Sequence, residues 1–237
     1  DVRAEPFLTG MIIAAVYHFS NSLKSFFSWH LVAATAFTAM AMMTKGPFTL
    51  VPIGGALAGQ LLFKQDWKQL FHLRWVLMLV LLTVFISPEL YSLWYQFDQH
   101  PEKIIFGGTN VSGIRFFLWD SQFGRFFNSG PIKGKGDPFF FLHTLLWAFL
   151  PWAILMYAAL FTKIKAAFNR ITRKQQEWYT LCGTLPALLM FSFSGFQLPY
   201  YTNILFPFLA ILTAGFVMEL NEKGIKRTAI LQGVIIG

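Results

Sequence analysis

Long apolar runs separated by short polar connectors make up most of this chain. A helix needs about 20 apolar residues to cross a bilayer, and windows of suitable composition recur along the sequence. An eighth begins near Thr228. The first seven windows are 6–21, 29–45, 47–63, 75–94, 138–161, 178–197 and 199–220. The pattern predicts an all-α polytopic membrane protein with about seven transmembrane helices and the start of an eighth.

One segment, residues 88–138, is neither a span nor a short connector. Most connections between elements have about 2 to 8 residues. The segment is rich in Phe and Trp, which argues against disorder, and it also carries many charged side chains. We therefore expect a long loop with short interfacial helices that packs on the membrane surface and forms part of a site.

The composition supports a membrane protein. Of the 237 residues, 55% are hydrophobic and 13% are charged, whereas soluble domains carry about 25% charge. The net charge of +8 would indicate nucleic acid as the partner of a soluble protein, but here Lys and Arg cluster beside the ends of apolar runs. We therefore expect membrane lipids, and no nucleic acid, as partners. The single cysteine, Cys182, lies in an apolar run and is expected in the core.

The distribution of Lys and Arg over the connectors predicts the orientation. Alternate connectors hold twelve of the nineteen basic residues against four acids, so the positive-inside rule places them in the cytoplasm. These connectors are residues 20–30, 64–74, 162–177 and 219–227. The opposite, outer face then holds the N-terminus, Lys45, the 88–138 segment and residues 197–201. Most of the unusual polar residues therefore share one face.

Two acids, Asp1 and Glu5, stand at the N-terminal membrane boundary, directly before Pro6. Acids ahead of a helix are favoured by its dipole, and Pro6 suits a first helical turn, so helix capping is one interpretation. The other is a general base or metal ligand at the mouth of an intramembrane cavity. The sequence leaves both open.

Lys45 ends the second window, just before the tight turn Gly46-Pro47. A lysine in this place can extend to lipid headgroups, or it can bind a phosphate as a point charge. Backbone N–H groups at the start of the next helix would add to an anion site. In the 88–138 segment, Arg125 can hold a phosphate bidentately. The alternative for Arg125 is a local ion pair with Asp120 in an interfacial helix.

Four more polar residues lie near the expected outer face: His143, Gln197, Tyr200 and Tyr201. Tyrosines at this depth usually form an interfacial belt, while an ionisable residue in a span is more often functional. The second interpretation is that the four line a substrate pocket. The sequence has no zinc-type cluster, Ser/His/Asp order or nucleotide-binding glycine fingerprint. For an enzyme whose site lies on the outer face, we therefore expect a substrate carried by a lipid and not by a soluble nucleotide.

Six motifs, in order along nearly the whole chain, resemble those of the protein-O-mannosyltransferase-like (family 39) glycosyltransferases, including the bacterial aminoarabinose transferase-like enzymes. The motifs are Arg3-Ala4-Glu5-Pro6-Phe7-Leu8, Met43-Thr44-Lys45-Gly46-Pro47, Pro88-Glu89-Leu90-Tyr91, Phe123-Gly124-Arg125-Phe126, Asp137-Pro138-Phe139 with Leu150-Pro151-Trp152, and Gln197-Leu198-Pro199-Tyr200-Tyr201 with Pro207. The chain departs from the family at two positions. Glu5 stands where the family usually has Asp, and Gln197 stands where it usually has Lys.

The resemblance implies the C-type glycosyltransferase fold, as one partial transmembrane domain over residues 1–237 with an extracytoplasmic loop at 88–138. The donor would be a polyprenyl-phosphate sugar, and a hydroxyl of a lipid, glycan or protein would attack its anomeric carbon with inversion. The only cofactor left open is a divalent metal ion. The implied residues are Glu5 and Asp1 for catalysis, Lys45 and Arg125 for the donor phosphate, and Asp120, His143, Gln197, Tyr200 and Tyr201 for the substrate pocket.

The family's first outer loop, with its acidic catalytic residue, would precede Asp1. We therefore expect an N-terminally truncated fragment that is inactive alone, from a protein of the bacterial inner membrane whose site faces the periplasm or exterior. The alternatives are a membrane transporter and a non-catalytic membrane scaffold. Transporters place polar residues near the bilayer midplane, often in two related halves. This sequence shows almost no charge at midspan and no internal repeat, which favours the enzyme.

Overall fold

A computed structural model describes residues 4–24, 28–127, 129 and 133–236, with only the backbone described at positions 125, 231 and 234–236. Every regular element in these ranges is a helix, and an isolated bridge between Ile105 and Gly108 is the one β contact that they contain. The all-α prediction is therefore confirmed for the part of the chain described.

The first half of the bundle is built on an antiparallel hairpin. Its helices are α1 (Glu5–Ser22), α2 (Trp29–Lys45), the 3-10 turn η1 (Pro47–Thr49), α3 (Leu50–Lys64), α4 (Trp67–Leu70) and α5 (Arg74–Leu93). The two helices of the hairpin, α1 and α2, pack along their length, with small residues of α2 such as Ala34 and Ala41 fully buried. Thr35 and Thr38 are also buried, and each hydroxyl donates to the carbonyl four residues earlier. Small side chains and self-satisfied hydroxyls let helices approach closely.

The second half packs against α3. Its helices are α8 (Phe140–Ala148), α9 (Ala153–Ala167), α10 (Arg170–Gln175), α11 (Tyr179–Ser192), the 3-10 turn η4 (Pro199–Leu205), α12 (Phe206–Met218) and α13 (Glu222–Ile236). Helix α11 lies against α3 at two glycines. A Cβ at Gly59 would lie 2.4 Å from the Cys182 sulfur, and one at Gly55 would lie 2.6 Å from the Cys182 carbonyl oxygen. Cys182 is thus a buried core residue, as predicted.

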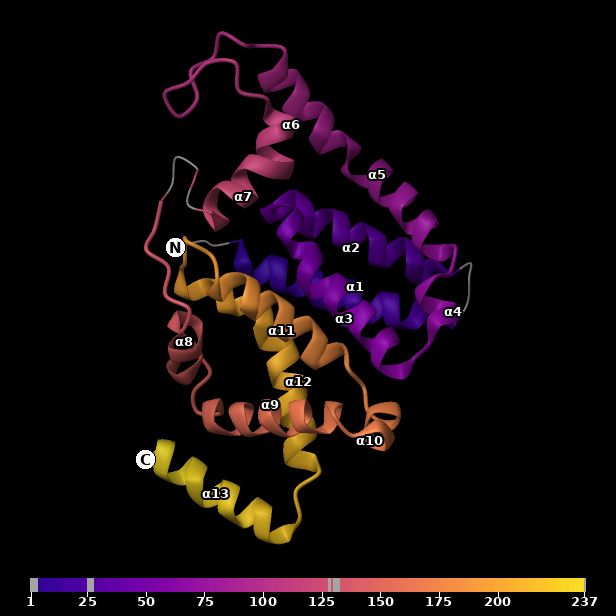
Figure 1. Ribbon diagram of the computed structural model, residues 1–237, viewed down its shortest axis with the longest axis vertical. Helices are drawn as coiled ribbons and strands as arrows, with labels where there is room; N and C mark the ends of the chain where they lie inside the picture. The colour runs from indigo at the N-terminus through magenta and orange to yellow at the C-terminus, as the bar shows by residue number, and fades with distance from the viewer. Residues whose placement is uncertain (1–3, 25–27, 128, 130–132, 237) are drawn as a thin grey trace.

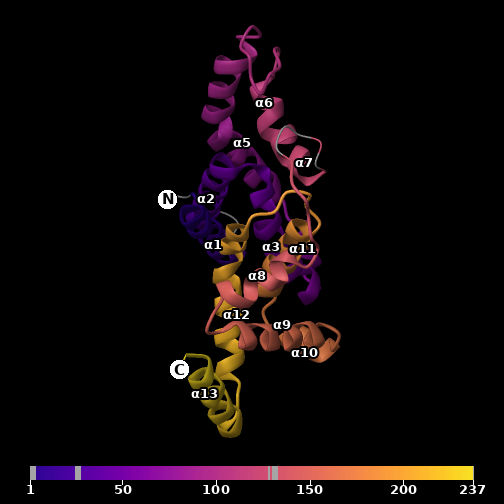
Figure 2. The same ribbon diagram turned by 90° about the vertical axis from the view of Figure 1, so that its left-hand side faces the viewer.

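The 88–138 segment leaves the bundle and returns to it (Figures 1 and 2). Helix α5 runs on into a π-helical turn, η2 (Trp94–Asp98), so the helix extends ten residues past Pro88. The return path contains α6 (Gly113–Arg115), a second π-helical turn, η3 (Phe116–Asp120), and α7 (Ser121–Phe126). The predicted short helices are present, and α7 brings the segment back beside the end of α2.

Two continuous helices in the described ranges, Trp67–Asp98 and Pro199–Met218, are long and apolar enough to cross a membrane by length and composition. The count of seven spans therefore stays a prediction. The window 138–161 is not one helix, because α8 ends at Ala148 and α9 begins at Ala153. Pro151 lies in this break, where its missing N–H and fixed φ cannot continue a helix.

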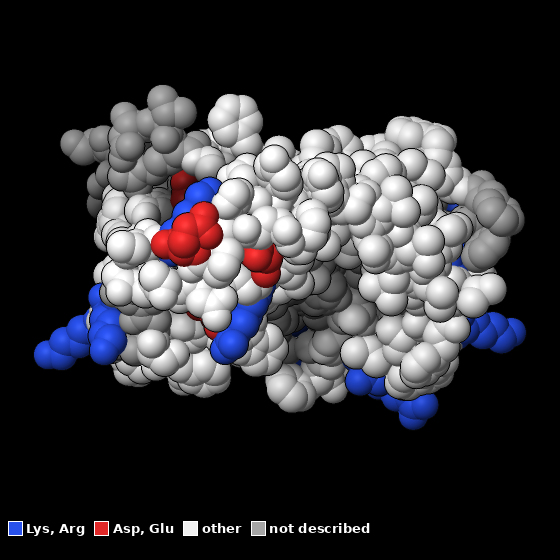
Figure 3. Space-filling model, turned by 90° about the horizontal axis from the view of Figure 1, so that it is seen from above, with Lys and Arg blue, Asp and Glu red and all other residues white. Residues whose placement is uncertain are grey.

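The elements expected on the outer face gather at one end of the bundle. In Figure 1 the start of α1, the end of α2, the α7 helix and the α11–η4 connection lie on the left, and α4 and α10 lie on the right. Figure 3 shows the molecule from above, with a broad uncharged area and the visible Asp and Glu side chains in the left half. Charged side chains on this face thus lie mainly toward the two ends of the bundle, and a largely uncharged surface lies between them.

Candidate active site

Glu5 and Lys45 meet at the left end of the bundle. Glu5 opens α1 and Lys45 closes α2, and because the two helices are antiparallel neighbours these termini come together. The Lys45 Nζ lies 2.6 Å from Glu5 Oε1, and only 5% of the Glu5 side chain is exposed. Each charge also suits its helix terminus, acid at the start and base at the end. The sequence analysis considered Glu5 and Lys45 as two separate candidate sites, and the structure joins the two side chains in one ion pair.

Two tyrosines lie beside the same ammonium. The Lys45 Nζ is 5.5 Å from the ring centroid of Tyr200 and 5.4 Å from that of Tyr201. Both distances are within the range of cation–π attraction. The rings belong to η4, which Pro199 begins. A turn from the C-terminal half therefore covers a charge pair built by the first two helices.

The turn after Lys45 is shaped for contact with α7. Gly46 has φ +92°, a backbone conformation that favours glycine. The Gln122 amide donates to the Lys45 carbonyl at 3.5 Å, and a Cβ on Gly46 would lie 2.2 Å from the same Gln122 nitrogen. The N–H groups of Gly46 and Thr49 are already used, by the carbonyls of Met42 and Gly46. The expected backbone anion site is therefore reduced, and the Lys45 ammonium is the main cation of this turn.

A cavity of about 430 Å³ opens beside this ion pair. Its walls are mostly apolar, with a few polar groups gathered near Lys45, as in sites that bind an apolar ligand with a charged head. Four separate stretches of the sequence supply the walls: residues 5–8, 45–51, 118–126 and 190–204. The lining residues are Glu5, Leu8, Lys45, Pro47, Phe48, Val51, Leu118, Ser121, Gln122, Phe123, Phe126, Met190, Phe191, Ser194, Phe196, Tyr201 and Ile204.

Gln197 supports the wall of this cavity from behind and is not among its lining residues. Its Oε1 accepts from the backbone N–H of Asp137 at 2.8 Å, and its Nε2 donates to the Asp137 carbonyl at 3.0 Å. The same Nε2 lies 3.2 Å and 3.1 Å from the carbonyls of Phe191 and Ser192. The side chain therefore clamps the chain around Asp137 onto the end of α11.

Close backbone packing continues this contact. Cβ atoms at Gly134 and Gly136 would lie 2.9 Å and 2.5 Å from the carbonyl oxygens of Gly195 and Ser194. The Gly195 N–H also donates to the Phe126 carbonyl of α7 at 2.9 Å. Residues 133–137, α7 and the loop after α11 thus form one layer over the cavity.

The remaining predicted site residues lie apart from the cavity or outside the description. His143 is exposed on α8 and does not line the cavity. Asp120 lies 3.4 Å from Arg115 in an exposed pair. Asp1 and the side chain of Arg125 fall outside the described residues, so the Asp120–Arg125 pair and the phosphate role of Arg125 stay predictions.

Several cavity residues were missed by the sequence analysis, notably Ser121, Gln122 and Ser194. A lone Ser or Gln in an aromatic stretch carries no spacing signal, and only the fold brings these residues to Lys45. Among the described residues, no three His, Cys, Asp or Glu side chains come together as a metal site. The polar chemistry observed at the cavity is that of one ion pair, hydroxyls and amides.

No protein-family model matches the sequence. The chain is 26% identical over 228 residues to the undecaprenyl phosphate-alpha-4-amino-4-deoxy-L-arabinose arabinosyl transferase of Erwinia tasmaniensis, over 94% of this chain and 37% of that protein. It is 25% identical over 218 residues to an uncharacterized protein of Aquifex aeolicus, over 91% of this chain and 38% of that protein. The chain therefore spans less than two fifths of these relatives.

Among solved structures, the chain is likewise similar to an aminoarabinose-transferase-type protein, ArnT. ArnT from Cupriavidus metallidurans bound to undecaprenyl phosphate superposes with a TM-score of 0.71 at 20% identity, over 98% of this chain and 39% of that chain. The apo form of that ArnT gives a TM-score of 0.69 at 21% identity, over 95% of this chain and 38% of that chain. Sequence and fold thus confirm the resemblance: the chain is homologous to ArnT-type glycosyltransferases and shares their C-type glycosyltransferase fold.

Proposed function

We propose that this chain forms the donor-phosphate site of a membrane glycosyltransferase. The enzyme transfers a sugar from a polyprenyl-phosphate-linked donor to a hydroxyl of a lipid, glycan or protein. The observation that carries the proposal is the Lys45–Glu5 pair at the polar end of a mostly apolar cavity. A long prenyl chain suits the apolar walls, and a phosphate suits the lysine. The likeness to an ArnT that binds undecaprenyl phosphate supports the same ligand class.

The reaction is a displacement at the anomeric carbon. The acceptor oxygen forms a bond to this carbon from the face opposite the phosphate, so the configuration inverts. The bond from the anomeric carbon to the phosphate oxygen breaks, and its electron pair stays on that oxygen. The acceptor proton passes to a base. Negative charge therefore grows on the phosphate as the reaction proceeds.

Lys45 is the group that responds to this growing charge. A fixed cation near a developing anion lowers the barrier because the interaction is stronger in the transition state than in the ground state. Glu5 and the two tyrosine rings hold the ammonium in place. Arg125, on α7 at the other side of the cavity, is proposed as a second phosphate ligand. Glu5 is a positioning residue for Lys45, and Glu5 together with Asp1 is proposed to support the catalytic base or to bind the acceptor.

We place the cavity on the extracytoplasmic face of the membrane, with the 88–138 segment as an outer loop. The asymmetric distribution of Lys and Arg supports this orientation, because the basic connectors that contain α4 and α10 lie at the end opposite the cavity. The Tyr-rich η4 turn also suits a membrane interface. On this basis the protein resides in a bacterial inner membrane.

Reconstitution of the full-length protein tests the proposal. Proteoliposomes receive labelled polyprenyl-phosphate sugars and a crude extract of lipid and glycan acceptors, and released polyprenyl phosphate is measured together with labelled acceptor. We expect coupled release by the wild type and a loss of about 100- to 1,000-fold in Lys45→Ala, since one lost electrostatic donor typically has this effect. The matched control, Lys165→Ala, removes an exposed lysine of α9 that lies outside the cavity and outside the layer over it.

Two results would overturn the proposal. One is near-normal transfer by the Lys45→Ala protein. The other is the absence of release with every donor, together with uptake of free solute by the same vesicles, which would identify a transporter.

A further inference from the structure

The end of the bundle opposite the cavity carries two short helices rich in basic residues. Helix α4 follows α3, helix α10 follows α9, and the Lys64 ammonium donates to the Lys174 carbonyl at 2.7 Å, which joins the two regions. We call this surface the basic platform. It consists of Lys64, Lys68, Arg170, Arg173 and Lys174.

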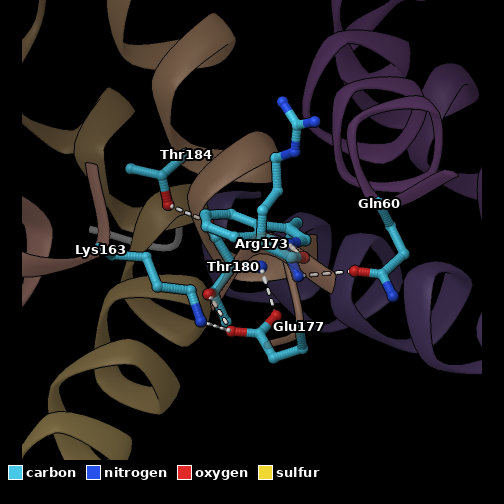
Figure 4. A network of polar contacts seen from close by, with 7 residues as sticks. Gln60, Lys163, Arg173, Glu177, Thr180 and Thr184 are labelled. Atoms are coloured by element: carbon cyan, nitrogen blue, oxygen red, sulfur yellow. Dashed lines mark hydrogen bonds and ion pairs between the residues drawn. The ribbon is translucent and has the colours of Figure 1, made fainter. Parts of the chain in front are cut away.

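The platform is anchored to the protein interior through the buried side chain of Trp178. Trp178 is fully buried and stacks on Phe63 with ring centroids 4.7 Å apart. Its indole N–H donates to the Arg173 carbonyl at 2.7 Å, and its backbone N–H donates to the Gln60 side chain at 2.6 Å (Figure 4). The backbone of α10 is therefore anchored to both α3 and the start of α11.

The acidic side chains near the platform, Glu177 and Asp66, already have partners outside it. Glu177 lies 3.1 Å from the Lys163 ammonium and also accepts from the N–H and hydroxyl of Thr180. Asp66 caps α4 by accepting from the Gln69 N–H. Within the described part of the chain, no ion pair neutralises the platform side chains, and the Arg173 guanidinium points away from Glu177 in Figure 4. The platform thus presents uncompensated positive charge.

Large apolar side chains surround these cations. Phe71 is 80% exposed, Phe168 88% and Ile171 73%, and the half-exposed Trp67 stacks on Phe71. Aromatic and aliphatic side chains beside Lys and Arg are typical of a surface that lies in the lipid headgroup region. A polar cavity of about 400 Å³ lies next to the platform; its lining includes Lys64 and Tyr179 and also the carboxylate of Asp66, so its charge is mixed. It offers room for a headgroup.

We propose that the basic platform is a binding site for anionic phospholipids of the membrane leaflet at this end, with headgroup phosphates held by Arg170, Arg173 and Lys174. The apolar side chains of α4 and α10 lie among the acyl chains. The inference rests on the proposed membrane location and is independent of the catalytic chemistry, because the platform and the Lys45 cavity are at opposite ends of the bundle.

Native mass spectrometry of the full-length protein in detergent tests the proposal. The protein is titrated with phosphatidylglycerol or phosphatidylcholine, and bound lipids are counted. The test variant is Arg170→Gln/Arg173→Gln/Lys174→Gln. The substitutions keep the backbone carbonyls of Arg173 and Lys174 that the network uses. Each basic residue at an anionic surface contributes about a fivefold change in binding, so we expect about a hundredfold weaker phosphatidylglycerol binding and unchanged phosphatidylcholine binding.

The matched control removes three lysines outside the platform, Lys103→Gln/Lys133→Gln/Lys135→Gln, and is expected to bind phosphatidylglycerol as the wild type does. Equal loss in both triple variants would show a general charge effect and overturn the site. Unchanged binding in the platform variant would overturn it as well. Sugar transfer in detergent is measured in parallel and is expected to persist in the platform variant, so a failure of the lipid site is distinguishable from a failure of the proposed enzyme.

Discussion

The two ends of the bundle contain the same small motif, a lysine paired with a glutamate beside an aromatic ring. At the cavity, Lys45 lies 2.6 Å from Glu5 and about 5.4 Å from the Tyr201 centroid. At the platform, Lys163 lies 3.1 Å from Glu177 and 5.2 Å from the Trp178 centroid. The geometry of the three groups is nearly the same at both ends.

The surroundings of the two motifs differ. Glu5 is buried and Lys45 lines a cavity, whereas Glu177 is 43% exposed at the side chain, Lys163 is 13% exposed, and neither of these two residues lines one of the two cavities described above. The Glu177 carboxylate also caps the start of α11 through Thr180. A charged pair is therefore available to a ligand at one end and serves the packing of helices at the other. A Lys–Glu ion pair alone does not identify a ligand site. The Lys45–Glu5 pair is a candidate because both of its residues line a cavity.

The largest effect on stability is expected at the platform. Trp178→Ala removes a fully buried indole, its stacking on Phe63 and its hydrogen bond to the Arg173 carbonyl, while the backbone hydrogen bond to Gln60 stays. Replacing a buried Trp by Ala typically costs about 3–5 kcal/mol, and thermal unfolding in detergent measures this loss. Trp67→Ala, at a half-exposed position, is the control and should change stability by less than about 1 kcal/mol. Equal losses would show that Trp178 is no special anchor.

The paired substitutions Glu5→Gln and Glu177→Gln test the comparison directly. Glu5→Gln removes the charge that positions Lys45, and we expect transfer to fall about 10- to 100-fold, the usual contribution of a residue that orients a functional group. Glu177→Gln changes a carboxylate that is 43% exposed and lies outside the cavity, so stability should change by about 1 kcal/mol and transfer should be unaffected. Turnover and unfolding are measured on both proteins. A large loss of transfer in Glu177→Gln together with normal transfer in Glu5→Gln would mean that the wrong end of the bundle has been identified as the functional one.

A substitution at the turn after Lys45 has a smaller expected effect. Gly46→Ala places a methyl group in a backbone conformation that other residues rarely adopt and against Gln122. Such strain costs about 2 kcal/mol, and it should weaken donor affinity because the turn carries Lys45. Gln122→Ala in the same protein relieves the contact but not the φ strain, so partial recovery is expected. Full recovery would assign the whole effect to the contact.

The smallest effect is expected from Gln197→Lys, which introduces the residue usual in the family. A lysine can still donate to the Asp137, Phe191 and Ser192 carbonyls but cannot accept from the Asp137 N–H. One lost hydrogen bond costs about 1 kcal/mol. Cleavage by trypsin after Lys133 and Lys135, measured over time, should become several-fold faster.

Gln197→Glu is the contrasting variant, because a carboxylate repels all three carbonyls and should expose these lysines further. Gln96→Glu is the control, since the exposed Gln96 amide donates to the nearby Ser92 hydroxyl at 2.9 Å and takes no part in the Gln197 contacts. Unchanged cleavage in both Gln197 variants would show that Gln197 is no clamp.

Much of the fold could be predicted from the sequence, because the apolar windows and Gly-Pro turns are local signals. The windows at 29–45 and 47–63 match α2 and α3 closely. The break between α8 and α9 was missed, since the run around Pro151 is apolar throughout and hydropathy does not register a lost N–H. The family motifs supplied the fold assignment that periodicity could not.

The site could be predicted only in part. Glu5, Lys45, Tyr200 and Tyr201 each lie at the outer end of an apolar window, and the bundle brings them together. Gln197 was expected in the pocket, but its amide is engaged with backbone groups that sequence spacing does not reveal. His143 faces outward because its helix, α8, buries Phe141 and Thr144 on another side.

The Lys45–Glu5 pair has a consequence for the catalytic cycle. An incoming phosphate must compete with a carboxylate already 2.6 Å from the ammonium. Because Glu5 competes for the Lys45 ammonium, it weakens the binding of the donor. It weakens to a similar degree the binding of the product, the polyprenyl phosphate, which carries more negative charge. Tight retention of the leaving product would stall the enzyme after one round. Under the proposed function, a Glu5 carboxylate that pairs again with Lys45 after each transfer favours release of the polyprenyl phosphate.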